Sequence, residues 1–599
     1  MGQSDCRSTF KDLTGGDNML HFKTEFEKEL FALEVRALDE KYDPAVRMTT
    51  SYRGKNGYHS RLSDCMVHDI RGSFDYAYQL LNRDGEGDRE RAHDILYRVI
   101  ALQDMNPARN TYGIWQYYLE EDLEEMNPPD WNWADFNGKV LLQMLNEHDS
   151  KLTEDIKARM RDSVCHACRA IIKRNVQPHY TNISVMGAYV TLYAGEFMDN
   201  EEFFTYGKNR LKALHAYNMS HGSFSEFNSP TYTFVCLEDL SALNHDIKDE
   251  ECKQLSTELI DLAWETVALH YHIASGQMAG PHDRAYAFLL ADSTKLSIER
   301  ALDYRIRLIG DYSIFNTKNI GNLHFTSELT CPDKYIPYFT EASGERILDQ
   351  TFASGRMAYT YINDVYTIGS LHRECAWNQH RNVLGYFGSV DAPVAFNLKC
   401  LHDDWDYCSA LMATVQEKGR TLTATAFTTD GGDTHVCLDM VKNAAIKAKD
   451  FRIRALFEGA VEYLTAEQVG DVSFRVTDTR NGLTVYIDFP YAVFGDAPVK
   501  FAIIRDSNKL GIDAILYCGE ETVIDFAAMK EAMIFTAVEY SLDGVRMADA
   551  AMNIDAEGEK ITGSFGNLTV KMNRKPDKGG IVSRSVELFR GGEAYTPAF

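Results

Sequence analysis

The stretch Met357-Ala-Tyr-Thr-Tyr-Ile362 is where the hydrophobic pattern of this chain changes. From about residue 355 onward, side chains alternate with a period of two, which is typical of β-strands with one buried face. Before that point, apolar residues recur every three or four positions, the period of an amphipathic helix. The change predicts a helical first part and a β-sheet second part, with the boundary between residues 310 and 355.

The helical pattern begins near residue 20. One apolar stripe at helical spacing is formed by Ile156, Met160, Val164 and Ala167, and short breakers such as Arg83-Asp84-Gly85 separate successive stripes. Each stripe must be buried against neighbouring helices, and no sequence repeat of fixed period indicates a solenoid. We therefore expect a ring of antiparallel helices, an α/α toroid.

Alternating runs continue towards the C-terminus, for example Thr421–Phe427, Val472–Thr477 and Leu483–Asp488. Asn481-Gly482 lies between two of them, and Asn-Gly is the strongest short signal for a hairpin turn. Many short strands joined by turn residues indicate an antiparallel β-sandwich. The predicted fold class is α+β with several domains: a tail at 1–20, a toroid carrying the site at 21–340, and the β-sandwich at 341–599.

Composition excludes several classes of function. A chain of 599 residues exceeds one compact core, and its net charge of -26 argues against binding to nucleic acid. No stretch approaches the roughly 18 apolar residues of a membrane span. The polar segment Met1–Phe10 has no signal-peptide pattern, so we expect a cytoplasmic protein that binds no membrane and keeps its twelve cysteines as free thiols.

Four polar segments lie at predicted helix ends, where side chains from different helices can meet in a cleft. The first, residues 113–137, places Trp115, Trp131 and Trp133 beside carboxylates such as Asp135. Sugars have flat C–H faces that stack on indole rings and hydroxyls that bind carboxylates, so these residues are candidates for sugar binding. The alternative is that the tryptophans belong to the core, where most tryptophans lie.

The second segment, Pro178–Ile183, places Tyr180 and Asn182 at the start of an apolar helix. We expect Tyr180 to contact the substrate. Asn182 can donate to a substrate carboxylate, but Asn182 or Thr181 can equally be the N-cap of that helix. The segment alone does not decide between the two interpretations.

The third segment, residues 221–232, contains His221, Glu226 and Tyr232 and is the most informative. Its Ser229-Pro230 is typical of an N-cap followed by a proline at the first helical position. Glu226 and Tyr232 have no such structural explanation, so we treat them as candidate catalytic residues.

The fourth segment, Met278–Tyr286, contains His282, Arg284 and Tyr286. Arginine can bind a carboxylate through two parallel hydrogen bonds, which favours a role in binding an acidic substrate. The alternative is a loop between helices with an ordinary surface ion pair.

In the β-sheet part, residues 372–381 are rich in titratable groups, and either His372 or His380 can face the cleft. A single histidine is more often structural than catalytic, so both interpretations stay open. Cys165-His166-Ala-Cys168 lies within one predicted helix. Zinc ligands usually come from more than one element, so we predict core packing there and no metal site.

The predicted architecture resembles the polysaccharide lyases of the chondroitin/hyaluronate and heparinase/oligoalginate types. His221-Gly-Ser-Phe224 is similar to the Asp-Gly-Ser-Phe motif of the chondroitin-type enzymes, and Tyr232 follows at a comparable distance. The resemblance implies that Tyr232 removes the C5 proton and protonates the leaving oxygen. It also implies that Asn182 and Arg284 neutralise the uronate carboxylate and that His372 or His380 is the histidine of the β domain.

Two positions differ from the family pattern. Glu226 and Phe227 lie near the position where a histidine usually follows Gly-Ser-Phe, and Tyr180-Thr181-Asn182 replaces the Asn-Asn-His triplet of alginate-type lyases. The residue that acts as the base is therefore not fixed by the motifs. A tyrosine has an ordinary pKa near 10 and needs cationic neighbours, such as His282 and Arg284, to act as one.

We hypothesise β-elimination on a uronate-containing oligosaccharide, with no cofactor. The expected cytoplasmic location favours short oligosaccharides as substrates and therefore exo action. One alternative is an inverting glycoside hydrolase that uses Glu226 with Asp130 or Asp135, which needs carboxyl groups about 6.5–9.5 Å apart. Another is a non-catalytic glycan-binding protein, against which the titratable residues in these loops argue. The oligomeric state is not predicted.

Overall fold

The computed structural model describes residues 20–54, 59–321, 323, 325, 329–342, 344–431 and 441–595. The predicted tail at 1–20 lies outside these ranges except for Leu20. Within them, no helix is long and apolar enough to cross a membrane.

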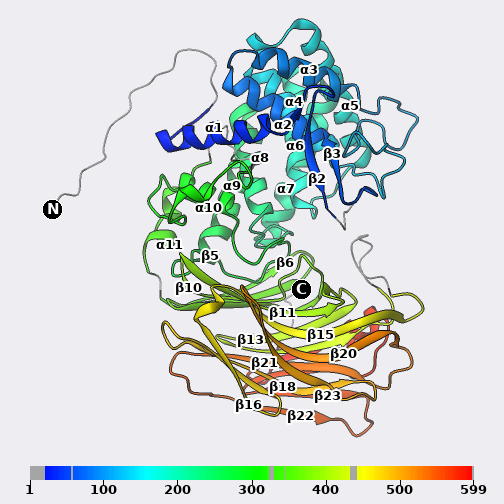
Figure 1. The fold of residues 1–599 in the computed structure, drawn as a ribbon, viewed down its shortest axis with the longest axis vertical. Coiled ribbons are helices and arrows are strands. Elements are labelled where there is room, and N and C mark those ends of the chain that lie inside the picture. Colours follow the sequence, from blue (N-terminus) through cyan, green and yellow to red (C-terminus); the bar gives the residue numbers. More distant parts are fainter. Residues whose placement is uncertain are drawn as a thin grey trace, which may run out of the picture.

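The first half of the chain is a series of antiparallel helix pairs, drawn in the upper part of Figure 1. The bounds are α1 Glu25–Asp39, α2 Ile70–Arg83, α3 Asp88–Ile100, α4 Trp133–Glu147, α5 Glu154–Arg174, α6 Thr181–Phe197, α7 Glu201–His221, α8 Tyr232–Asp246, α9 Glu250–His270, α10 Asp292–Ala301 and α11 Pro337–Thr340. Helices α2, α4, α6 and α8 contact one another in that order and together line an inner cavity of about 440 Å³. Their partners α3, α5, α7 and α9 form the outer row, as in an α/α toroid.

The predicted stripe of α5 explains this packing. Ile156, Met160, Val164 and Ala167 are all buried in one hydrophobic core shared by the helices. A small three-stranded sheet and one strand pair interrupt the helices where only helices were expected. They are β1 Tyr42–Asp43 and β2 Met48–Arg53 with β3 Cys65–Asp69, and β4 Tyr271–His272 with β5 Gln277–Met278.

In the described part of the second half, three antiparallel sheets of nine, seven and five strands are stacked, drawn below the helices in Figure 1. The nine-stranded sheet contains β6 Arg346–Phe352, β7 Arg356–Ile362, β8 Tyr366–Leu371, β10 Val383–Ser389, β11 Ala392–His402, β12 Trp405–Asp406, β15 Ala445–Gly459, β19 Lys500–Arg505 and β20 Lys509–Asp525. The seven-stranded sheet contains β9 Arg373–Cys375, β13 Ala410–Glu417, β14 Arg420–Phe427, β16 Leu464–Gly470, β17 Ser473–Asp478, β18 Thr484–Phe494 and β21 Ala532–Ser541. The five-stranded sheet contains β22 Ala550–Ile554, β23 Lys560–Phe565, β24 Leu568–Asn573, β25 Glu587–Arg590 and β26 Glu593–Ala594, with helix α12 Gly579–Ser585 beside it.

Two hydrophobic layers hold the sheets together. Phe396 and Phe457 of the first sheet share a core with Val538 of the second. On its other face, the second sheet packs Leu422 against Val570 of the third. The predicted toroid followed by an antiparallel β-sandwich is therefore confirmed, and the third sheet extends the sandwich.

The nine-stranded sheet carries the toroid loop 279–286 directly on its surface. Thr360 of β7 donates from Oγ1 to the carbonyl oxygen of Gly280 at 2.8 Å. A bridge between the backbones of His282 and Arg381 extends this contact. Gly369 of β8 lies so close to Gly280 that an added Cβ would be 1.8 Å from its carbonyl oxygen.

Replacing Gly369 with Ala is expected to push loop 279–286 off the sheet. The obstructing atoms belong to the backbone and cannot rotate away, so the cost should reach at least the roughly 1–3 kcal/mol typical of overpacking. Thermal unfolding of both proteins measures the loss. Gly321→Ala is the control, because no atom of the described residues lies within 4 Å of an added Cβ there. Equal melting temperatures for Gly369→Ala and the wild type would contradict this packing.

Candidate active site

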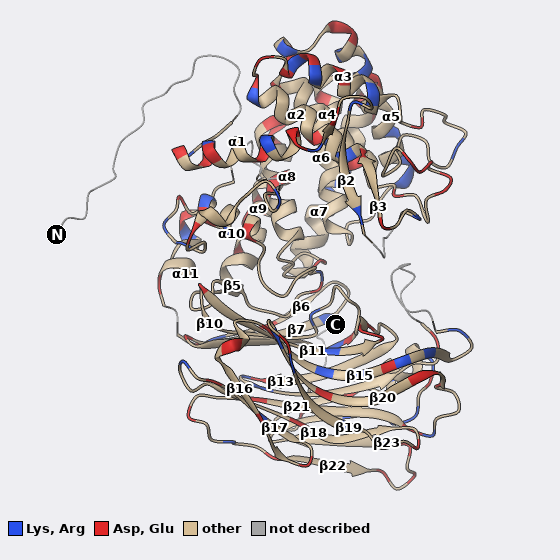
Figure 2. Ribbon diagram, viewed as in Figure 1, with Lys and Arg blue, Asp and Glu red and all other residues tan. Residues whose placement is uncertain are grey.

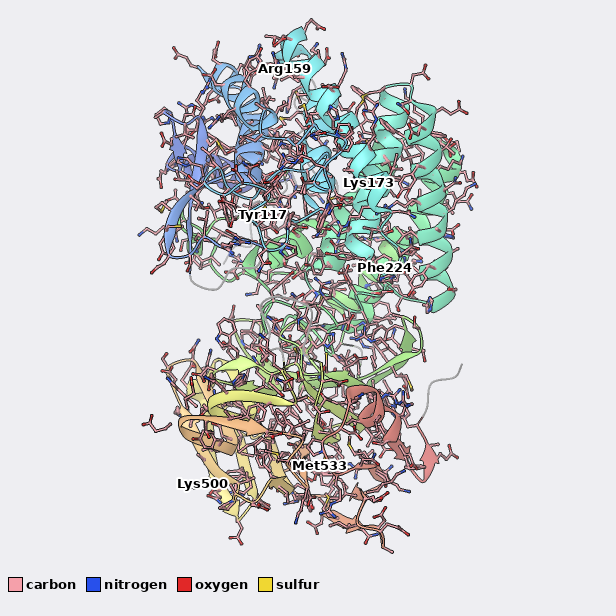
Figure 3. The ribbon with its side chains drawn as sticks, turned by 90° about the vertical axis from the view of Figure 1, so that its right-hand side faces the viewer. Tyr117, Arg159, Lys173, Phe224, Lys500 and Met533 are labelled. Carbon is pink, nitrogen blue, oxygen red and sulfur yellow. The ribbon has the colours of Figure 1, made fainter. Side chains whose placement is uncertain are left out.

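A cavity of about 970 Å³ lies where the toroid meets the nine-stranded sheet. It is lined by the starts of α6 and α8, by the toroid segments 128–132 and 283–286, and by residues 377–380 of the β-sheet part. Figure 3 labels Tyr117, one of the lining residues of the toroid. Although the chain is strongly acidic, its Asp and Glu residues are spread over helices and sheets (Figure 2), and this cavity contains several cations.

Two toroid loops are tied together beneath the cavity. Nδ2 of Asn228 donates to the carbonyl oxygens of Ala279 and Pro281, at 2.7 and 3.0 Å. Oγ of Ser229 accepts from the backbone N–H of Tyr232 at 2.9 Å and donates to the carbonyl oxygen of Arg284. These bonds place the side chains of two candidate catalytic residues, Tyr232 and Arg284, next to each other.

The predicted capping role of Ser229 agrees with its hydrogen bonds, because its Oγ accepts from the N–H of Tyr232 and its carbonyl oxygen accepts from the N–H of Thr233 at 3.1 Å. Helix α8 begins at Tyr232, and its N-cap is Thr231. The N-cap of α6 is Tyr180, so Thr181 and Asn182 lie in the first turn of that helix and neither is its cap. Asn182 is therefore not the N-cap of α6, and it forms part of the cavity wall.

Arg284 is the centre of the site. Its Nη1 donates to Oε1 of Glu226 at 2.9 Å, its Nη2 to the hydroxyl of Tyr232 at 3.1 Å, and its Nε to Oε1 of Gln379 at 2.7 Å. The guanidinium also lies 4.7 Å from the ring centroid of Tyr232 and 5.3 Å from that of Trp377. Contacts on all sides fix one orientation of this cation.

Asn182 and Glu226 form the second part of the cluster. The backbone N–H of Asn182 donates to Oε2 of Glu226 at 2.8 Å, and its Nδ2 lies 2.7 Å from both carboxylate oxygens. Burial raises the pKa of Glu226, while Arg284 and Asn182 act to lower it. Since both carboxylate oxygens already accept hydrogen bonds, this carboxylate orients the Asn182 amide and Arg284.

The hydroxyl of Tyr232 faces two donors. It contacts Nη2 of Arg284 and also shares a hydrogen bond with the hydroxyl of Tyr286. Burial raises the pKa of Tyr232, and Arg284 opposes that change without reversing it. Tyr232 is therefore a phenol at neutral pH, but its oxygen is placed where an anion would be stabilised.

His380 gives the cavity a second fixed cation. Its Nε2 lies 3.1 Å from Oδ1 of Asp283, and Arg356 donates from Nη1 to Oδ2 of the same carboxylate at 2.9 Å. Burial alone would lower the pKa of His380, but the contact with Asp283 outweighs it and raises that pKa to about 10. Burial likewise acts to raise the pKa of Asp283, and His380 and Arg356 reverse this and hold it well below its usual range. The imidazole is therefore positively charged at neutral pH.

A further group of lining residues lies on the toroid side. Nδ2 of Asn132 donates to the hydroxyl of Tyr180 at 3.2 Å, and Arg174 donates to Oδ1 of Asn132. Trp131 also lines the cavity, with its indole N–H bound to the carbonyl oxygen of Asn110 at 3.1 Å. This group offers an aromatic ring, a hydroxyl and a cation to a ligand.

The structure brings together nine of the residues selected from sequence: Asp130, Trp131, Tyr180, Asn182, Glu226, Tyr232, Arg284, Tyr286 and His380. Three others from the tryptophan-rich segment lie elsewhere. Trp115 is fully buried, and its Nε1 donates to the carbonyl oxygen of Val99 at 3.0 Å. Trp133 packs in the same helical core, and Asp135 is buried below the cavity. Trp133 and Asp135 lie in the first turn of α4, which directs their side chains into the helix packing, whereas Trp115 is buried in the core from the segment before that helix.

Three predicted histidines also lie away from the cavity. At the end of α7, Nδ1 of His221 bonds the carbonyl oxygen of Tyr217 at 2.7 Å. In the β-sheet part, Nε2 of His372 lies 3.1 Å from the carbonyl oxygen of Tyr595. His282 is buried, and burial lowers its pKa to about 3. It is therefore uncharged and cannot supply the positive charge that was expected beside Tyr232.

Sequence reasoning missed several lining residues, among them Asn132, Arg174, Asp283, Arg356, Trp377 and Gln379. Four of them lie inside segments that were selected for their polarity: Asn132 lies in the segment 113–137, Asp283 follows His282, and Trp377 and Gln379 lie between His372 and Arg381. Arg356 and Arg174 come from the start of a strand and the end of a helix, where an arginine has no distinctive sequence signal.

Residues 28–302 match a family model described as a domain of unknown function (DUF8769). No curated protein matches the chain. Similar solved structures include a heparinase III (9% identity, covering 84% of this chain and 83% of the other, TM-score 0.35). A heparan sulfate lyase HepC mutant from Pedobacter heparinus (8%, 96% and 89%, TM-score 0.33) and a chondroitin AC lyase from Streptomyces coelicolor A3 (9%, 89% and 98%, TM-score 0.35) are also similar. Similarities at this level say nothing about activity.

Proposed function

We propose that this chain is a lyase that cleaves a uronate-containing oligosaccharide by β-elimination. The observation that carries the proposal is the position of Arg284, which contacts Tyr232 and Glu226 in an open cavity that also contains Asn182 and His380. Elimination needs a proton-transfer group beside donors that stabilise an acidic substrate, and this cluster offers both.

In the proposed reaction, N–H donors of Asn182 and Arg284 and the positive charge of His380 stabilise the uronate carboxylate. This makes the C5 proton more acidic. The reactive form is the phenolate of Tyr232, whose own hydroxyl proton has first passed to water. The phenolate oxygen takes the C5 proton, the electron pair of the C5–H bond forms the C4–C5 double bond, and the C4–O bond breaks. The leaving oxygen then receives a proton from Tyr232. Arg284 and Tyr286 stabilise the transient negative charge on the Tyr232 oxygen.

The geometry favours elimination over hydrolysis by Glu226. A general acid must carry a proton, whereas both oxygens of Glu226 accept hydrogen bonds from Asn182 and Arg284. Asp130 does line the cavity, but its Oδ2 accepts from the hydroxyl of Tyr117 at 2.6 Å. Asp135 is buried below the cavity and is not available as the second carboxyl group.

The test is the ultraviolet absorbance of an unsaturated uronate during incubation with uronate-containing oligosaccharides. We expect the absorbance to rise, in the presence of EDTA as well, because the proposed steps require no cofactor. Release of reducing sugar without this absorbance would establish hydrolysis and exclude the lyase proposal. Sizing the products over time tests exo action, which predicts one small product from the first turnovers.

A further inference from the structure

Three arginines line the cavity among the described residues, and two of them are neutralised by carboxylates. Arg284 pairs with Glu226, and Arg356 pairs with Asp283. Arg174 differs, because no carboxylate oxygen of the described residues lies within 4.0 Å of its guanidinium nitrogens. A fixed, unpaired cation in a cavity attracts an anionic group of the ligand.

One hydrogen bond orients the guanidinium of Arg174 and leaves its other N–H donors available to a ligand. Arg174 is the last residue of α5, and Nη1 donates to Oδ1 of Asn132. Nδ2 of Asn132 in turn donates to the hydroxyl of Tyr180 at 3.2 Å. All three side chains line the cavity. Since a guanidinium has five N–H donors, this single bond leaves most of them for a ligand.

Two carboxyl groups of this region form no ion pair with Arg174. Asp130 lines the cavity, but its oxygens accept from the hydroxyl of Tyr117 at 2.6 Å and from the backbone N–H of Asn132 at 3.0 Å. The carboxyl of Asp135 is close enough for Arg174 to act on its charge, but burial raises the pKa of Asp135 to about 7, against the opposing effects of Arg210 and Arg174. This carboxyl is therefore only partly ionised at neutral pH, and it is not among the groups that line the cavity.

The position of Arg174 relates it to the proposed reaction centre. Tyr180 is two residues before Asn182, so the Arg174–Asn132–Tyr180 group lies along the cavity wall from the Asn182–Arg284–Tyr232 cluster. Trp131, adjacent to Asn132, also lines the cavity. A sugar ring bound here would neighbour the ring that loses its proton.

We propose that Arg174, with Asn132 and Tyr180, forms a second anion-binding subsite that selects substrates with a carboxylate or sulfate group on the sugar next to the cleaved uronate. The identity of the neighbouring sugar rests on the proposed function. The anion-binding property of Arg174 does not, because it follows from the charges in the cavity.

The test is calorimetric binding of three tetrasaccharides to the full chain carrying Tyr232→Phe, with and without Arg174→Gln. One ligand has a carboxylate on every sugar, one alternates uronate with unsulfated hexosamine, and one is the same alternating sugar with sulfate on the hexosamine. We expect Arg174→Gln to weaken binding of the first or the third ligand about tenfold, while binding of the second changes less than about twofold. Loss with the first ligand identifies a carboxylate site, and loss with the third identifies a sulfate site.

The neighbouring residue provides a matched control. Lys173 is exposed on α5, its Nζ lies 3.3 Å from the carbonyl oxygen of Arg109, and Figure 3 labels it in the toroid. Lys173→Gln removes the same charge from the same helix end and should leave all three affinities unchanged. Arg174→Lys keeps the charge without the planar fork and should give intermediate affinities.

Equal losses for all three ligands, no loss for any of them, or a loss matched by Lys173→Gln would overturn the subsite. Melting temperatures of the variants show whether each is folded. The wild-type elimination assay tests the reaction separately from these binding measurements. A protein that binds the anionic ligands through Arg174 but yields no unsaturated product would refute the proposed function while supporting the subsite.

Discussion

Replacing Tyr232 with Phe should reduce turnover about a thousandfold or more while leaving the fold intact. The hydroxyl is the group that takes and returns the proton in the proposed reaction, and acid–base catalysis by one side chain is typically worth 10²–10⁴-fold. The aromatic ring remains, so its stacking with the Arg284 guanidinium at 4.7 Å is preserved. Initial rates from ultraviolet absorbance measure the effect, and circular dichroism with thermal unfolding checks the fold.

Tyr286→Phe is the matched control for this substitution. It removes the other hydroxyl of the Tyr232–Tyr286 hydrogen bond, but Tyr286 is 59% exposed, and Arg284 donates to the hydroxyl of Tyr232. We expect a loss of about tenfold or less, the effect of removing one donor to the Tyr232 oxygen. A Tyr232→Phe protein with wild-type turnover would remove Tyr232 from the mechanism.

The sequence predicts the fold well where one period dominates. The buried stripe of α5 is a strong local signal, because burial of one helix face imposes its period. The run 357–362 was correctly predicted as a strand, β7, although all of its residues are buried, so it lacks the exposed face that a period of two implies. Met48–Arg53 was missed because it is a short strand inside a region whose neighbours are helical. Its partner Cys65–Asp69 follows after the segment 54–64, which is longer than the loop of a tight hairpin, so the hairpin was not recognised.

For the site, residue type and loop position were informative, but side-chain direction was not. Glu226, Tyr232 and Arg284 were found because polar, titratable side chains interrupt apolar helices. Trp115 was selected for the same aromatic character that places it in the helical core. The charge of His380 could not be inferred, because it depends on Asp283, which is 97 positions away in the chain and reaches it only through the contact of toroid and sheet.

The contact between Asp283 and His380 leads to the prediction with the largest effect of pH. In the wild type, burial would lower the pKa of His380, but Asp283 raises it to about 10, so the imidazolium is present below that pH and is lost as pH rises through it. The ionised fraction of Tyr232, whose pKa is raised, grows with pH. We therefore expect kcat/KM to increase from neutral pH and then fall near pH 10, as measured by a pH–rate profile.

Asp283→Asn keeps the shape of the side chain but removes the charge that protonates His380. Burial is then opposed only by the contact with Cys375, so the pKa of His380 should fall to its ordinary value of about 6.5 or below. The alkaline limb should move from about pH 10 to below about pH 7, and kcat/KM at pH 8 should fall about a hundredfold or more. Glu374→Gln is the control, because Glu374 binds Nε of Arg356 at 2.6 Å and its substitution leaves the Asp283–His380 contact in place.

The same contact links protonation to folding. Because the folded-state pKa of His380 is above the unfolded value, its stabilising effect is complete below about pH 6.5 and is lost as pH rises to about 10. Wild-type melting temperatures should fall over this interval more steeply than those of Asp283→Asn. The rate data then separate two roles for His380. If the imidazolium stabilises the substrate carboxylate, Asp283→Asn slows the reaction at pH 8. If neutral His380 were the base, the variant would contain more of the active form at that pH, and its rate would hold or increase.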